Sequence, residues 1–172
     1  MSQPVVVVAY DPDWPHLFDE LRGRVVTALG ELAVVIEHVG STSVPGLAAK
    51  PIIDMDVVIP SPADLPAAIT RLAAIGYRHK GNLGIPEREA FAPPPGRQSH
   101  HLYVCPLGSE EFRRHIAFRD YLRAHPEEAR VYGACKQTAA DRFRDDRAAY
   151  MLAKHELVAA MVQRALHWVH DG

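Results

Sequence analysis

Apolar residues follow two different spacings along this chain, and the pattern changes near residue 108. Before that point, short apolar runs rich in β-branched residues alternate with stretches of helical spacing, which predicts strands packed against helices. The predicted strands cover residues 5–9, 34–39, 52–59, 77–80, 85–92 and 100–105. After residue 108 only helical spacing occurs. The pattern therefore predicts a mixed sheet of four to six strands followed by a helical C-terminal part.

The predicted helices have clear start signals. Trp14 opens a stripe of apolar residues at helical spacing, and Pro15 fits the first turn of a helix. Ser61 and Pro62 form a second start, and Pro126 forms a third. The expected helices span residues 14–29, 61–75, 109–124, 126–138 and 145–169, and the proline-rich residues 93–99 are expected to form an irregular loop. The expected fold class is α+β, with one domain over residues 1–172 made of a sheet-containing core (1–107) and packed C-terminal helices (108–172).

Composition excludes several classes of function. The chain has 172 residues, 48% of them hydrophobic, and a formal net charge of -2, so no charge attracts it to a long nucleic-acid duplex. No run of about eighteen apolar residues predicts a membrane span, and the N-terminus does not resemble a signal peptide. Two widely separated cysteines are typical of reduced thiols, so a cytoplasmic location is expected. A pocket for a nucleotide or another phosphorylated small molecule remains open.

Two aspartates interrupt the apolar run at residues 52–59. Asp54 and Asp56 are two positions apart, so on a strand both carboxylates point to the same face. Adjacent carboxylates repel each other unless a cation lies between them, and Mg²⁺ or Mn²⁺ is the expected occupant. The alternative is a strand edge with two solvated aspartates.

A Gly-Ser turn precedes this strand by about a dozen residues. Gly40 has no Cβ, so the backbone can turn sharply and approach a ligand closely. The serine hydroxyl and the backbone amides of such a turn can bind a phosphate. The candidate phosphate ligands of this turn are Gly40, Ser41, Thr42 and Ser43.

The segment HVGSTSVPGLAAKPIIDMDV resembles the signature of the GrpB-like family within the DNA polymerase β-like nucleotidyltransferase superfamily. The likeness continues in YDPDWPHLF, HHLYVC, FRDYLRAHP and the pair Tyr150 and Lys154, so it covers nearly the whole chain. It implies a minimal nucleotidyltransferase fold with the Gly-Ser turn and the Asp-x-Asp pair on neighbouring elements. It also implies that Asp54 and Asp56 hold Mg²⁺ or Mn²⁺.

Active members of the wider superfamily add a third carboxylate from a later strand, and the strand predicted here at 100–105 has none. Alternation places His101 and Tyr103 on the face opposite the core, where His101 can act as a metal ligand or a base. Its alternative is a strand histidine with a structural hydrogen bond. Glu87 and Glu89 are further candidates for the missing acid.

Several cations sit at positions that favour an anionic ligand. Lys50 precedes the Asp-x-Asp strand, and Arg119 and Lys154 fall on the apolar stripes of their helices, where a cation needs a partner. Arg123 follows Arg119 by one turn, and Arg88 flanks the proline-rich loop. Each can instead lay its stem on the core and its charge in water.

The chemistry expected from these residues is nucleotidyl transfer. Asp54 and Asp56 would hold the metal, His101 would serve as ligand or base, and a hydroxyl on an unknown acceptor would attack the α-phosphorus of a nucleoside triphosphate. A nucleic-acid acceptor fits the low net charge least well. The alternative is a catalytically silent module of the same fold that binds a nucleotide or a phosphorylated ligand. A metal-dependent phosphohydrolase is a third hypothesis.

Overall fold

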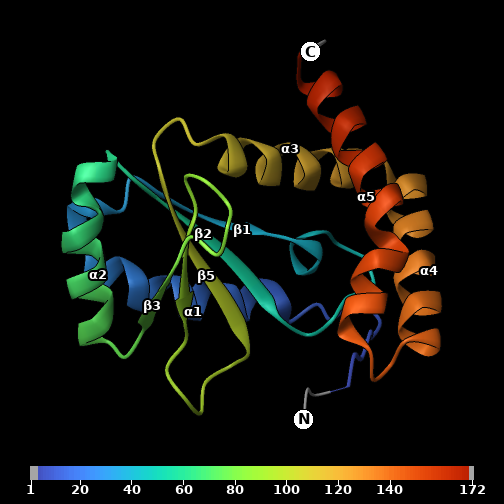
Figure 1. Cartoon of the computed structure of the whole chain (residues 1–172), viewed down its shortest axis with the longest axis horizontal. Coiled ribbons are helices and arrows are strands. Elements are labelled where there is room, and N and C mark those ends of the chain that lie inside the picture. The colour runs from blue at the N-terminus through green and yellow to red at the C-terminus, as the bar shows by residue number, and fades with distance from the viewer. Residues whose placement is uncertain (1–3, 171–172) are drawn as a thin grey trace.

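A five-stranded mixed sheet lies at the centre of the computed structural model, which describes residues 4–170 (Figure 1). The strands are β1 (Val35–Val39), β2 (Ile53–Ile59), β3 (Arg78–Gly81), β4 (Glu89–Ala92) and β5 (His100–Pro106). Their order across the sheet is β1-β2-β5-β4-β3. β2 and β5 run parallel, and the other neighbours are antiparallel. The mixed sheet and the α+β class expected from the sequence are confirmed.

Helices lie on both sides of this sheet. They are α1 (Trp14–Leu29), α2 (Leu65–Ala74), α3 (Glu110–Ala124), α4 (Pro126–Arg142) and α5 (Arg147–His170). α1 and α2 cover one face, α3 lies over the other, and α4 and α5 stand beyond the end at which β2 and β5 begin (Figure 1). None of the helices in residues 4–170 combines the length and apolar character needed to cross a membrane.

The core explains why the Asp-x-Asp pair points away from α1. Ile53, Met55 and Val57 of β2 are fully buried in the same cluster as the apolar stripe of α1. Burying each such side chain contributes about 1.5–3 kcal/mol, which fixes this face of β2 toward α1. The intervening residues, Asp54 and Asp56, must therefore face α3 and the C-terminal helices.

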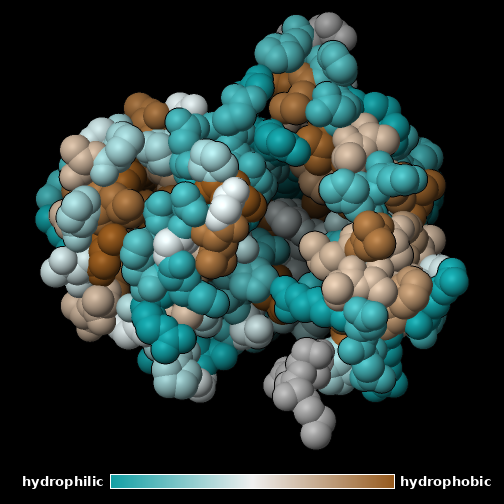
Figure 2. All heavy atoms as spheres, viewed as in Figure 1, coloured by the Kyte–Doolittle hydropathy of each residue, from teal (hydrophilic) through white to brown (hydrophobic). Residues whose placement is uncertain are grey.

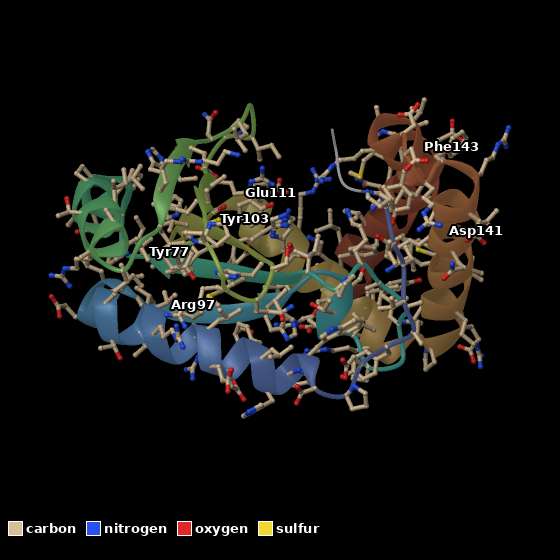
Figure 3. All side chains as sticks on the ribbon, turned by 90° about the horizontal axis from the view of Figure 1, so that it is seen from below. Tyr77, Arg97, Tyr103, Glu111, Asp141 and Phe143 are labelled. Carbon is tan, nitrogen blue, oxygen red and sulfur yellow. The ribbon has the colours of Figure 1, made fainter. Side chains whose placement is uncertain are left out.

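The prediction of a strand at residues 5–9 is wrong. Val8 forms an isolated antiparallel bridge to Ala49, and the Val5 amide donates to the Arg144 carbonyl at 2.7 Å. Val5 and Val7 are buried against the helical part, in a cluster that includes Tyr150. These two side chains are buried without the segment joining the sheet, while Val6 and Val8 are exposed. Beside this segment, α4 continues past the predicted residue 138 to Arg142, near the Asp141 and Phe143 labels of Figure 3.

Candidate functional site

Asp54 and Asp56 share one face of β2, as their spacing predicts, but their surroundings differ. The parallel register places His101 beside Asp54 and Tyr103 beside Asp56. The Asp54 side chain is 27% exposed and lines a cavity between the sheet and the C-terminal helices. Asp56 is fully buried and is covered by α3. The two carboxylates are therefore chemically distinct.

Each of these aspartates is hydrogen-bonded to an imidazole. His101 Nδ1 lies 2.8 Å from Asp54 Oδ1, and His115 Nδ1 of α3 lies 2.6 Å from Asp56 Oδ2. Burial raises the pKa of Asp56 and opposes the charge on His115. Two acids face this one imidazole, however, because His115 Nε2 also lies 3.2 Å from Glu111 Oε1. They raise the pKa of His115 to about 9, so we assign an imidazolium at neutral pH.

Glu111 and His115 are functional candidates that the sequence analysis missed. Glu111 of α3 and Tyr103 of β5 lie close together on the side of the sheet away from α1 (Figure 3). The sequence feature that could have indicated them is their four-residue spacing, which puts both on one helix face. That face could be recognised as inward only once Asp56 was known to lie beneath it.

The Gly-Ser turn packs directly onto Asp54. Gly40 has a φ of 72°, and a Cβ added to it would lie 2.3 Å from Asp54 Oδ2. Thr42 and Ser43 are buried and already engaged, Thr42 with His38 Nε2 at 2.9 Å and Ser43 as a donor to the Gly40 carbonyl at 2.5 Å. Their hydroxyls hold the turn in shape, and a contact of either residue with phosphate stays a prediction. Gly40, Ser41 and Thr42 line the cavity next to Asp54.

We expect Gly40→Ala to lower the free energy of unfolding by about 1–3 kcal/mol and to displace the Asp54 carboxylate. Gly46→Ala is a matched control, because Gly46 also has a positive φ, 81°, but an added Cβ there meets nothing within 4 Å. Urea denaturation of both variants measures the difference. Equal destabilisation by the two substitutions would show that the contact between Gly40 and Asp54 contributes nothing.

A cavity of about 290 Å³ lies beside the Gly-Ser turn, and four cationic side chains line it. They are Lys50 before β2, Lys136 of α4, and Arg147 and Lys154 of α5. Asp54 is the one acid among the lining residues, all of which lie in the described part of the chain. The molecular surface is hollowed between the sheet and the C-terminal helices (Figure 2). Lys50 and Lys154 were predicted from the sequence, whereas Lys136 and Arg147 were not.

Lys136 has the most unusual environment of the four. It is 2% exposed, its Nζ has no hydrogen-bond partner among the described residues, and it lies 4.4 Å from the centre of the Tyr132 ring. Burial, then repulsion between the lysines, lowers the pKa of Lys136 to about 7 and that of Lys154 to about 8. The same causes, with Arg147 as the repelling neighbour, lower the pKa of Lys50. The other titratable groups that face these lysines are Asp54, Cys135, Tyr132 and Tyr150.

Three predicted phosphate ligands lie outside the set of residues that line the cavity. Arg119 donates to Glu37 Oε2 at 2.6 Å and to the His38 carbonyl at 3.1 Å. Arg123 donates twice to the Ser43 carbonyl, at 2.9 and 2.7 Å. From α3, Arg123 therefore holds the Gly-Ser turn, and Arg119 holds the strand β1 that leads into it. Arg88 stacks 4.2 Å from the centre of the Tyr103 ring, and Tyr103 itself lines the cavity.

The prediction that Glu87 or Glu89 supplies a third carboxylate is wrong. Glu89 pairs in register with Val104, so it lies on the opposite face from Tyr103, and its Oε2 is 2.6 Å from His79 Nε2. Glu87 precedes β4 in a left-handed conformation and accepts a hydrogen bond from the Glu110 amide at 3.3 Å. The carboxylate that does lie next to this site is Glu111, which contacts His115, the partner of Asp56.

Two solved structures of low sequence identity share this fold. The chain is similar to the GLD-2/RNP-8 complex (TM-score 0.60, 14% identity, covering 87% of this chain and 60% of that one). It is also similar to the Cid1 poly(U) polymerase H336N mutant bound to MgATP (TM-score 0.53, 11% identity, covering 76% and 45%). At such identities the likeness establishes the fold. The fold of this chain is therefore of the nucleotidyltransferase class.

The GrpB protein family model matches residues 4–164, and the chain belongs to this family. A UPF0157 protein of Pseudomonas aeruginosa is 40% identical over 94% of this chain and 68% of its own length. YqkA of Bacillus subtilis is 35% identical over 97% of this chain, which spans about half (49%) of YqkA. The crystal structure of GrpB from Enterococcus faecalis is 33% identical, with a TM-score of 0.88 over 95% of this chain and 99% of that one.

Proposed function

We propose that the cavity between the sheet and the C-terminal helices binds a nucleoside triphosphate. The observation that carries this proposal is the convergence of Lys50, Lys136, Arg147 and Lys154 on a cavity with a single carboxylate. Lys136 is the buried member of this set, and its Nζ has no hydrogen-bond partner among the described residues. An uncompensated buried cation is costly, and a polyphosphate would supply the missing negative charge. The nucleotide-bound Cid1 structure of the same fold supports this choice of ligand.

The lining residues suggest how the nucleotide would bind. The ammonium groups and Arg147 would contact the phosphates from the helical side, and the turn at Gly40 and Ser41 would meet them from the sheet side. The rings of Tyr103 and Phe118 would offer apolar surface to the nucleoside.

Transfer of the nucleotidyl group to a hydroxyl acceptor is the second function that we propose. Its specific support is the Asp54–His101 pair, in which the carboxylate orients Nδ1 while Nε2 has no hydrogen-bond partner among the described residues. Nε2 would take the proton of the acceptor hydroxyl as its oxygen bonds to the α-phosphorus and the bond to pyrophosphate breaks. A small molecule or a protein side chain fits the net charge of -2 better than a nucleic-acid end.

Pyrophosphate release distinguishes the enzyme from a silent binding module. We would incubate the protein with each labelled nucleoside triphosphate, Mg²⁺ or Mn²⁺, and pools of acceptors. Release that disappears in Asp54→Ala would support transfer, whereas tight binding without release would support the module. Phosphate release without an acceptor would instead indicate a phosphohydrolase.

Nucleotide affinity is expected to increase with the number of phosphates and to fall as the pH rises. The pKa values of Lys136 (about 7) and Lys154 (about 8) imply that both lysines lose charge between about pH 6 and pH 9. A bound polyanion favours their protonated forms, so binding takes up protons in this range. Calorimetry in buffers of different ionisation enthalpy measures the uptake.

The same titrations compare ATP, ADP and AMP, and we expect ATP to bind at least about tenfold more tightly than AMP. Equal affinity for ATP and AMP, or affinity independent of pH, would contradict the assignment of the phosphates to the lysines. Absence of binding by any of these nucleotides, and by their guanine, cytosine and uracil counterparts, would overturn the proposed function.

A further inference from the structure

Asp56 does not offer a divalent cation the ligands that the family resemblance implies. It is fully buried, it is not among the residues that line the cavity, and His115 holds its Oδ2 at 2.6 Å. Oδ1 has no hydrogen-bond partner within residues 4–170 and would be free to bind a cation, but it is buried beneath α3. Mg²⁺ gives up its water reluctantly, so a hydrated ion could reach Oδ1 only if α3 moved.

Asp54 is accessible, but one of its two oxygens is already hydrogen-bonded. His101 holds Oδ1 at 2.8 Å, and Oδ2 packs against Gly40. Within residues 4–170, no three His, Cys, Asp or Glu side chains come together in a group that could hold a metal ion. The donor set of a two-metal site is therefore not assembled in this fold.

The charges around Asp54 further disfavour a second cation. Four cationic side chains line the same cavity, and two of them lie close to the Tyr150 ring, with Lys154 Nζ at 5.0 Å and Lys50 Nζ at 5.4 Å from its centre. A divalent ion would add to this repulsion, whereas a phosphate chain would relieve it. The lysines thus provide the positive charge that a metal ion provides elsewhere.

We infer that this cavity takes its nucleotide as the free polyanion, with Lys50, Lys136, Lys154 and Arg147 in place of a divalent cation. The inference rests on the proposed nucleotide binding, and it departs from the Mg²⁺ or Mn²⁺ requirement expected from the sequence. Mg²⁺ neutralises the phosphates in solution, so it competes with the lysines for them.

Calorimetric titration of ATP in EDTA and in an excess of Mg²⁺ tests the inference. The expected result is binding in EDTA that is as tight as in Mg²⁺ or up to about tenfold tighter. Binding that requires Mg²⁺ would overturn the inference and leave the proposed nucleotide binding intact. Absence of binding in both conditions would overturn both, so the two failures are distinguishable.

An Asp54→Asn variant distinguishes phosphate binding by the lysines alone from binding through a metal held by Asp54, because the two predict opposite changes in ATP affinity. If lysines alone bind the phosphates, removing the one carboxylate is expected to strengthen ATP binding in EDTA several-fold. If Asp54 holds a metal, the same change weakens binding in Mg²⁺ and overturns the inference. Asp141→Asn changes an exposed acid outside this cavity and serves as the control. Circular dichroism verifies the fold of both variants.

Mn²⁺ titration of the wild type, followed by electron paramagnetic resonance, tests metal binding directly. It is expected to show no stoichiometric site for Mn²⁺.

Discussion

Replacing His115 by alanine is expected to lower the free energy of unfolding by about 3–5 kcal/mol. The variant would leave Asp56 fully buried with neither of its oxygens paired, since Oδ1 already lacks a partner. It would also remove the partner of Glu111. Urea denaturation measures the loss. A difference below about 1 kcal/mol would show that Asp56 does not depend on the imidazolium.

The loss of stability caused by His115→Ala is expected to become smaller as the pH rises. The folded-state pKa of His115, about 9, lies above the ordinary value of about 6.5. Its contribution to stability is therefore complete below about pH 6.5 and is lost as the pH rises through about 9. His16→Ala is the control, because the pair formed by His16 and Glu20 is exposed to water. That substitution is expected to change stability by less than about 0.5 kcal/mol.

Lys136→Met is expected to stabilise the fold while weakening nucleotide binding. Methionine fills a similar volume without placing a buried, unpaired charge beside Lys50 and Lys154, so we expect a gain of about 1–3 kcal/mol in the free energy of unfolding at pH 7. The gain should shrink as the pH rises from about 7 and vanish above about pH 10.5, where the lysine is neutral in the folded and unfolded states alike. ATP affinity should fall by about tenfold or more, through loss of a charge-assisted hydrogen bond.

Lys80→Met provides the matched control, because Lys80 is an exposed residue of β3. It should leave both stability and affinity close to those of the wild type. Loss of stability in Lys136→Met would contradict the account, since it would mean that the buried ammonium has a structural partner. Unchanged ATP affinity would remove Lys136 from the binding site.

The sequence was sufficient for the elements whose own residues determine them. The stripe that opens at Trp14 predicted α1 with the bounds that the structure has. The period-two alternation of β5 predicted that His101 and Tyr103 share a face with the aspartates. The prediction of a strand at residues 5–9 was wrong because a β-branched run indicates burial but does not identify the segment it packs against. Here that segment is the C-terminal helical part.

The residues that were missed at the site depend on packing between distant segments. Lys136 follows Tyr132 by four positions on the inward face of α4, so its spacing was a usable signal. Its significance required the knowledge that Lys50 and Lys154 face the same cavity. Arg119 shows the converse, since its place on an apolar stripe correctly indicated a partner, but that partner is Glu37 and not a phosphate.

The central claim is that nucleotide phosphates bind between the Gly-Ser turn and the lysines of the C-terminal helices. Calorimetric titration of ATP and AMP against the wild type and Lys136→Met tests it most directly. The account predicts saturable binding at one site, a preference of at least about tenfold for ATP, and a weaker ATP complex in the variant. Equal affinities for ATP and AMP, or an ATP complex that is unchanged in Lys136→Met, would contradict it.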